Sequence, residues 1–382
     1  MNNIFSKYLT GDKVIWMITI LLSLFSLLIV YSSTSQLSYK FRGGNTEAYI
    51  LKHALILGAG FLIMVYVHKF KINYFSRLSQ IGIVVSVILL LLVLLLPSEK
   101  DAQRWLFGFQ PSDIAKISLI VYLARQLSVY KDQLKSFKVI AIKIMLPIAL
   151  ICGLILPADL STALMLFAIS MVLVFISSVS LTHIGAILGS AIIGFFLLLL
   201  LGTALPNLLP RVSTWKSRIA AFAGGDEAEN AADKNYQTDI AKAGIANGGL
   251  QGTGPSKSRV KNLLPSAWAD FIFAIFIEEY GSILGGLTLI LLYLIILYRV
   301  IIIAKNSKSD FGSYLAFGLG FSIVFQAFLN MGVSVNLLPV TGQPLPMISM
   351  GGTSILFTSI AFALILSVSK DVFNDKNLAN ES

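Results

Sequence analysis

Long hydrophobic runs recur along nearly the whole chain, and they constrain its fold more than any other feature. They lie at 14–34, 49–68, 76–97, 112–130, 139–157, 161–180, 182–204, 270–303, 312–336 and 350–371. Most are close to the ~20 residues that an α-helix needs to cross a hydrocarbon core of ~30 Å. Only 13% of the 382 residues are charged, which is too few to coat a soluble globule of this length. The sequence therefore predicts an all-α integral membrane protein with about ten transmembrane helices.

Basic residues are divided unevenly between alternate loops. An even number of spans places both termini on one side of the membrane. If that side is the cytoplasm, the inner side holds the basic residues of 7–13, 69–77, 131–138, 299–308 and 370–376. The short outer loops then hold only Lys40, Arg42, Lys100 and Arg104. The positive-inside rule predicts this orientation, and attraction to anionic lipid explains the net charge of +10 without a nucleic-acid partner.

Residues 205–269 form the longest stretch without a hydrophobic span, between predicted helices 7 and 8 on the outer side. Ile240, Ala243 and Ile245 indicate a short amphipathic helix on or in the membrane surface. Loops of this length are usually functional or disordered, and we expect the C-terminal half of this one to be ordered. We therefore predict a single membrane domain, 1–382, that contains one large extracytoplasmic loop, 205–269.

Asp270 stands where a hydrophobic helix begins, in the string LPSAWADFIFAIFIEEYG. An ionisable side chain at the edge of a span is costly unless it is paired or hydrated, so it is a candidate for function. Asp270 could cap the following helix, because Asp is among the best N-cap residues. It could equally accept a proton from a substrate hydroxyl at the membrane rim, beside a cationic loop. The residues alone favour neither interpretation.

Five other carboxylates and cations lie within or next to the spans. Glu278 and Glu279 are adjacent and should point in different directions, and pairing with a buried Lys or Arg is their favoured role. Asp113 and Lys116 have the i, i+3 spacing of an ion pair on one helix face, which would be structural or functional. Asp159, in PADLSTA, is placed to cap a helix.

The segment 336–353, NLLPVTGQPLPMISMGGT, contains no charged residue but is rich in Pro and Gly. Such a sequence predicts an irregular, rigid connection whose backbone polar groups need protein or water partners. It could form a wall of a substrate cavity, or it could be a plain turn.

The sequence lacks the residue patterns that several kinds of site require. His53, His68 and His183 have no metal-site spacing and suggest no catalytic triad, and the single Cys152 excludes an internal disulfide and a cysteine metal cluster. No glycine-rich nucleotide loop is present, so the sequence does not predict ATP-driven work.

The same strings, taken in order, resemble the SEDS family (shape, elongation, division and sporulation), which includes FtsW and RodA. The strings are QPSDIAK, PADLSTA, YQ at 236, NGGLQGTG, LPSAWADFIFAIFIEEYG and NMGVSVNLLPVTGQPLPMISMGGTS. The likeness extends over almost the whole chain and looks somewhat more like FtsW. Ser266, Met350 and the Pro-Ala before Asp159 depart from the family pattern, so no site role is transferred to Asp159.

The resemblance implies a peptidoglycan glycosyltransferase that polymerises lipid II at the outer face of the bacterial cytoplasmic membrane. The family's essential carboxylate matches Asp270, which favours catalysis over capping there, and its acidic and lysine pair matches Asp113 and Lys116. The resemblance also implies a class B penicillin-binding protein as partner, together with other membrane proteins of division or elongation.

The leaving diphosphate needs cationic groups to bind and stabilise it. The candidates for this substrate-binding role on the outer side are Arg104, Arg211, Arg218 and Lys257. We assign Gln237, in the matching Tyr-Gln pair, to substrate binding as well. The sequence shows no dedicated metal site and predicts no other cofactor, and a divalent cation, Mg or Mn, would assist the leaving group. Three alternatives stay open: a RodA-like polymerase of elongation, a lipid II flippase, and a scaffold for a transpeptidase.

Overall fold

The predicted hydrophobic runs are helices in the computed structural model, which describes residues 9–34, 46–95, 105–106, 108–204, 212, 215, 231–264 and 267–380. Within this part of the chain, eight helical stretches are long and apolar enough to cross a membrane. Two more of the predicted runs are helices that fall short of those limits. α9 (Leu160–Ile176) is apolar but short, and α6 (Pro111–Val129) carries Asp113, Lys116 and Arg125. The all-α membrane class is therefore confirmed.

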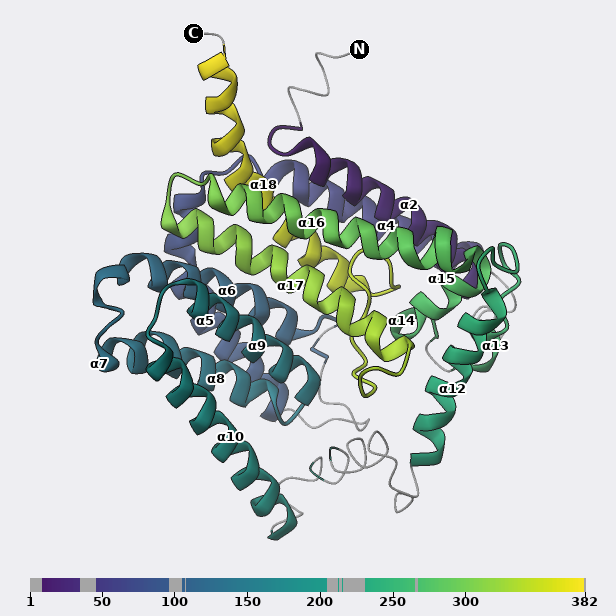
Figure 1. Cartoon of the computed structure of the whole chain (residues 1–382), viewed down its shortest axis with the longest axis horizontal. Helices are drawn as coiled ribbons and strands as arrows, with labels where there is room; N and C mark the ends of the chain where they lie inside the picture. Colours follow the sequence, from purple (N-terminus) through teal and green to yellow (C-terminus); the bar gives the residue numbers. More distant parts are fainter. Residues whose placement is uncertain are drawn as a thin grey trace. The chain divides into compact units, whose positions relative to one another are not determined.

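The first of two compact units contains 1–71, 233–308 and 319–382. Its helices are α2 (Lys13–Ser33), α4 (Thr46–Val67), α12 (Ala231–Gly248), α13 (Val260–Leu263), α14 (Ala267–Asp270), α15 (Ile272–Gly281), η3 (Ser282–Leu287), α16 (Thr288–Lys305), α18 (Gly352–Asn380) and most of α17 (Asp310–Ser334). α4 packs along α18, and α2 contacts α4, α15 and α16 (Figure 1).

The second unit contains 72–232 and 309–318. It consists of α5 (Ile72–Leu95), α6, η1 (Lys131–Gln133), α7 (Phe137–Ile140), η2 (Ala141–Met145), α8 (Leu146–Ile155), α9, α10 (Leu181–Ala204) and the start of α17. α5 packs along α6, and α8 contacts both α5 and α9. The C-terminal ends of α5 and α8 and the first residues of α6 and α9 form one pocket in this unit.

The two ends of the first unit's chain meet at one end of that unit. Asp12 caps α2 by accepting hydrogen bonds from the amides of Val14 and Ile15. Its own amide donates to Ser369 Oγ at 2.9 Å, and its carboxylate pairs with Arg299 at 2.6 Å. The start of α2 and the end of the buried part of α18 therefore lie side by side.

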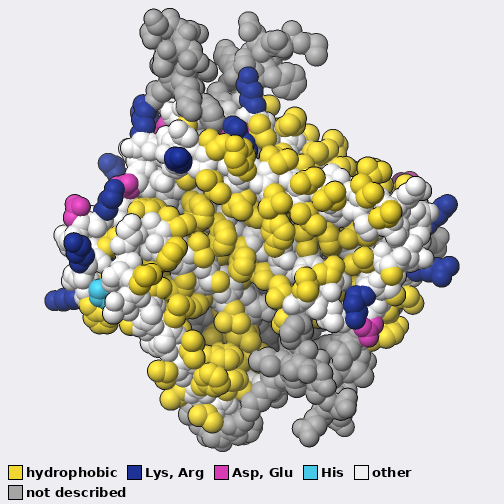
Figure 2. All heavy atoms as spheres, viewed as in Figure 1, with side chains coloured by type: hydrophobic (Ala, Val, Ile, Leu, Met, Phe, Trp, Pro, Cys, Tyr) yellow, Lys and Arg dark blue, Asp and Glu magenta, His cyan; other side chains and the backbone are white. Residues whose placement is uncertain are grey.

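Hydrophobic side chains cover much of the molecular surface that Figure 2 shows, and Lys and Arg side chains lie around its margin. Many large apolar residues of the spans are exposed, including Leu55, Leu62, Ile81, Leu291 and Tyr298. An exposed apolar surface of this kind is stable only where lipid replaces water. The surface thus agrees with the membrane class indicated by the sequence.

The predicted span 270–303 contains a break that the sequence analysis did not anticipate. Gly281 ends α15 with φ of 82° and ψ of 168°, a conformation that is accessible chiefly to glycine. The segment 249–254 covers the break. The amide of Thr253 donates to Glu278 O at 2.9 Å, that of Gly254 to Glu279 O at 3.0 Å, and that of Ser282 to Gly249 O at 2.8 Å. Backbone groups freed from the helix are thereby satisfied, which non-helical backbone at membrane depth requires.

Gly281→Ala tests this close approach. A Cβ there would lie 2.3 Å from Leu250 O, in addition to the strain of positive φ. We expect a loss of about 2–4 kcal/mol in unfolding free energy, from strain and overpacking together. The measurement is the thermal midpoint of the purified protein in detergent. Gly153→Ala is the control, because a Cβ at Gly153 meets nothing within 4 Å; an equal loss in both variants would contradict the steric explanation.

The predicted loop 205–269 is partly helical, since α12, α13 and part of α14 lie within it. The short helix expected around Ile240 is present and runs to Gly248. Its most buried face is a different one from that formed by Ile240, Ala243 and Ile245. Small residues make it, namely Thr238, Ala241, Gly244 and Gly248. A Cβ at Gly248 would lie 2.4 Å from Ile277 O, so these small residues let α12 approach the backbone of α15.

Candidate functional site

Asp270 lies at the junction of two helices in the first unit. It is the last residue of α14, and the next residue, Phe271, leaves the helical conformation with φ of −118° and ψ of 23°. Phe271, not Asp270, occupies the N-cap position of α15. The capping interpretation of Asp270 is therefore wrong. Asp270 is partly exposed, so its carboxylate is neither sealed among apolar helices nor on the open surface.

The last three carbonyl groups of α14 are each held by a distant part of the unit. The bonds are Met350 N to Trp268 O at 3.2 Å, Ser349 Oγ to Ala269 O at 2.6 Å, and Asn330 Nδ2 to Asp270 O at 2.9 Å. A helix of four residues cannot satisfy these carbonyls itself. The main chain at Asp270 is thus fixed by α17 and by the segment 336–351.

The uncharged segment 336–351 is irregular and its backbone groups have protein partners, as its sequence predicts. Its backbone accepts hydrogen bonds from buried side chains on three helices, namely Tyr293 OH to Pro346 O, Gln326 Nε2 to Pro344 O at 2.9 Å and Ser26 Oγ to Ile348 O at 2.8 Å. Gly342 adopts φ of 68°, and a Cβ there would lie 3.9 Å from Asp270 Oδ2. The segment therefore forms a wall beside the Asp270 carboxylate, while the substrate cavity itself stays a prediction.

Glu278 organises the polypeptide that leads from α12 to α14. It is 1% exposed and its carboxylate accepts four hydrogen-bond donors, none of which is a Lys or Arg side chain. The donors are Asn247 Nδ2 at 3.0 Å, Arg259 N at 3.0 Å, Val260 N at 3.2 Å and the hydroxyl of Ser258. The expected pairing with a buried cation is thus wrong for Glu278, because main-chain amides take that place.

Glu279 points to different partners, as expected for adjacent helical residues. Its carboxylate lies 4.0 Å from Lys261 Nζ and accepts a hydrogen bond from the hydroxyl of Ser32. Lys261 is also buried, and its ammonium donates to Ser256 O at 2.7 Å and to Ser32 Oγ at 3.2 Å. Pairing with a buried cation is confirmed for this residue. The contact ties the end of α2 to the segment before α14.

The predicted substrate-binding residues fall partly within the described chain. Lys257 is exposed, in the turn between Gly254 and Ser258 that Glu278 holds, and Gln237 is partly buried on α12. Both belong to the first unit, with Asp270. Arg104, Arg211 and Arg218 lie outside the described residues.

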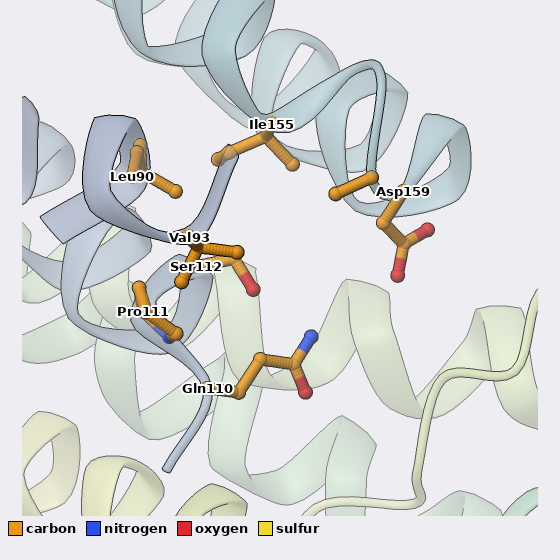
Figure 3. Close-up of a pocket in the computed structure, with 8 residues that line it drawn as sticks. Leu90, Val93, Gln110, Pro111, Ser112, Ile155 and Asp159 are labelled. Atoms are coloured by element: carbon orange, nitrogen blue, oxygen red, sulfur yellow. The ribbon is translucent and has the colours of Figure 1, made fainter. Parts of the chain in front are cut away.

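Asp113 and Lys116 form their predicted i, i+3 ion pair in the second unit, with 3.7 Å between carboxylate and ammonium. Both side chains are mostly buried on the first turns of α6. A small pocket opens next to this turn. Its apolar lining comes from Leu90, Val93, Pro111, Ile155 and Ala158, and its polar lining from Gln110, Ser112 and Asp159 (Figure 3).

The pocket has a volume of about 20 Å³, which suits a single water molecule. Ser112 Oγ is buried without a hydrogen-bond partner among the described residues, so it needs such a water. Asp159, the third polar residue of the lining, caps α9 by accepting the Thr162 amide at 3.1 Å. Its predicted capping role is confirmed.

Asn330 and Ser349 are site residues that the sequence analysis missed. Each lies in a stretch of apolar and small residues, where an amide or hydroxyl has no local pattern to distinguish it. Their partners are 60 and 80 residues away in sequence. In the described part of the chain, no group of three His, Cys, Asp or Glu is arranged to hold a metal ion.

These elements define a multi-pass helical membrane protein with a partly exposed carboxylate, on an anchored main chain, at the junction of a loop and a span. A family model described as cell cycle protein, covering FtsW, RodA and SpoVE, matches residues 12–373. The chain belongs to this family, which the sequence resemblance predicted.

Curated relatives extend over nearly the full length. A probable peptidoglycan glycosyltransferase FtsW of Geobacter metallireducens is 30% identical and covers 94% of each chain. The stage V sporulation protein E of Bacillus subtilis is 29% identical and covers 96% of this chain and 98% of its own.

Two solved structures share the fold. One, titled as a peptidoglycan synthase complex that coordinates polymerization and crosslinking, has a TM-score of 0.72 at 24% identity and covers 96% of this chain and 100% of its own. The other, the rod shape determining protein RodA of Thermus thermophilus, has a TM-score of 0.66 at 21% identity, with coverage of 96% and 99%.

Proposed function

We propose that this protein is a peptidoglycan glycosyltransferase of the FtsW type, which polymerises lipid II into glycan strands at the outer face of the cytoplasmic membrane. The observation that carries the proposal is the Asp270 carboxylate, partly exposed on a main chain that is anchored on three consecutive carbonyls. Full-length similarity to proteins named peptidoglycan glycosyltransferase supports the reaction class.

Asp270 acts as the general base in this proposal. Its carboxylate takes the proton from the 4-hydroxyl of the acceptor GlcNAc while that oxygen forms a bond to C1 of the donor MurNAc. The bond from C1 to the phosphate oxygen breaks, its electron pair leaves with undecaprenyl pyrophosphate, and the configuration at C1 inverts. A positioned general base typically contributes a factor of about 10² to 10⁴ in rate.

The departing diphosphate requires positive charge close to the developing negative charge. Lys257 is exposed in a turn that Glu278 anchors, and it belongs to the same unit as Asp270. We assign Lys257 to this role, together with Arg104, Arg211 and Arg218 and with Gln237 as a further substrate contact. Mg²⁺ or Mn²⁺ would add to the same charge stabilisation.

A partner that crosslinks the new strands completes the proposed role. The structural neighbour titled as a synthase complex for polymerization and crosslinking supports a class B penicillin-binding protein as that partner. We assign the protein to cell division and place both termini in the cytoplasm, following its FtsW relatives and the distribution of basic residues.

Incubation of the detergent-purified protein with lipid II tests the proposal. We expect a ladder of glycan strands on a gel, formed alone or with the partner penicillin-binding protein present. A lipid II transporter would leave the substrate unpolymerised under every condition while moving it across proteoliposome membranes. That result would replace the glycosyltransferase assignment.

A further inference from the structure

Asn330 is buried on α17 and bonds to the main chain of the proposed catalytic residue. Its side chain is 1% exposed. Nδ2 donates one hydrogen bond to Asp270 O at 2.9 Å and a second to Gln343 O at 2.8 Å. One amide group thus connects the junction of α14 and α15 with the wall segment beside the Asp270 carboxylate.

Among the described residues, the Asn330 side-chain amide forms hydrogen bonds only through its amino group. Oδ1 is buried without a hydrogen-bond partner among the described residues. A buried amide oxygen that lacks a partner is unfavourable, so a residue chosen for stability alone would not leave it so. Because both accepting groups are carbonyls, only the amino end of the amide can face them, which fixes the orientation of the side chain.

The position of these two bonds determines what they control. Asp270 ends α14, and the chain turns at Phe271, so the Asp270 carbonyl lies at a helix end, where carbonyls lack intrahelical partners. Gln343 follows Gly342, whose Cα faces Asp270 Oδ2. The donors of Asn330 therefore hold together the two main-chain segments between which the carboxylate sits.

We propose that Asn330 is a positioning residue for glycosyl transfer, which holds Asp270 and the wall segment at a fixed separation. The inference rests on the proposed function, with Asp270 as general base. A displacement of about 1 Å at a reacting group can lower the rate about 10²-fold. Loss of the two donors should therefore act on kcat and leave the binding of the lipid and diphosphate groups unchanged.

Gln326 provides a matched control one helical turn earlier on α17. It is 3% exposed, and its Nε2 donates to Pro344 O at 2.9 Å. It holds the same wall segment through the same kind of bond, but this bond goes to Pro344 O, whereas Asn330 also donates to the main chain of Asp270. Removal of either amide should loosen the segment, but removal of Asn330 alone should free Asp270.

The test compares Asn330→Leu with Gln326→Met, which remove the donors at nearly constant volume. Purified proteins are assayed for kcat and KM with lipid II and for their thermal midpoints. We expect similar losses of thermal midpoint, a kcat about 10²-fold lower for Asn330→Leu with KM within about threefold, and a kcat within about threefold for Gln326→Met. Asn330→Thr keeps one donor and should fall between wild type and Asn330→Leu.

Each other outcome rejects the proposal. Equal kcat losses in the Leu and Met variants, or a kcat that follows the thermal midpoint, would mean that Asn330 only stabilises the fold. The same conclusion holds if neither Asn330 variant folds while Gln326→Met does. A wild-type protein that polymerises nothing would instead overturn the proposed function, so the two failures are distinguishable.

Discussion

Replacing Asp270 with asparagine is expected to abolish glycan polymerisation and to leave the protein folded. An amide cannot accept the proton of the attacking hydroxyl, so the rate should fall by about 10² to 10⁴, to the detection limit of a gel assay. The fold should persist because Asn330 anchors this residue through its main-chain carbonyl, which asparagine retains. The measurement is the glycan ladder formed from purified lipid II, beside the thermal midpoint of the same preparation.

Asp239→Asn is the matched control for that experiment. Asp239 lies on α12 in the same unit, where it is 64% exposed and forms an ion pair with Lys242. The variant makes the same chemical change at a solvated surface, and we expect its polymerisation rate to stay within about twofold of wild type, because exposed ion pairs contribute little. Full activity of Asp270→Asn would reject the assignment of the general base.

The positions of the spans could be predicted from the sequence because length and hydrophobicity determine them locally. α6 shows the limit of that signal. It is a helix as predicted, but Asp113, Lys116 and Arg125 lower its hydropathy below that of the other spans. Their partners, among them Ser76 O for Arg125 at 2.9 Å, come from the tertiary structure. The break at Gly281 was missed for the same reason, since the segment that stabilises it begins 32 residues earlier, at Gly249.

The candidate site was likewise predictable only in part from the sequence. Asp270 could be found because a carboxylate at the edge of a span is conspicuous, and its role was indicated by the family resemblance. The residues that hold it, Asn330 and Ser349, are uncharged and depend on contacts between distant segments. The partners of Glu278 were mispredicted because main-chain amides can satisfy a buried carboxylate as well as a cation does, and a sequence does not show where amides converge.

Glu278→Leu is expected to destabilise the polypeptide between α12 and α14 more than any other single change described here. The substitution leaves the amides of Arg259 and Val260 and the hydroxyl of Ser258 without their acceptor. Two of these residues, Ser258 and Val260, are at most 3% exposed, so water cannot readily replace the carboxylate. Each unsatisfied buried donor costs about 1–3 kcal/mol, which predicts a total loss of at least about 3 kcal/mol.

Hydrogen exchange locates that loss. The amides of Arg259 and Val260 should exchange much faster in Glu278→Leu, while those of α16, which lies beyond the break at Gly281, should keep their protection. Polymerisation should fall with them, because Lys257 lies in the turn that the carboxylate anchors. A uniform rise in exchange over the whole unit would contradict a local role for Glu278.

Glu278→Gln removes the negative charge but keeps an acceptor oxygen, so it distinguishes the contribution of the charge from that of the hydrogen bonds. Gln keeps the shape of Glu and one acceptor oxygen, which can still accept from Ser258 and Val260. Its amino group can donate to the side-chain oxygen of Asn247 after that exposed amide rotates. We expect a loss of only about 1 kcal/mol, the difference between a charge-assisted and a neutral network. Comparable losses in the Gln and Leu variants would show that the negative charge, rather than the geometry of its acceptors, holds the segment.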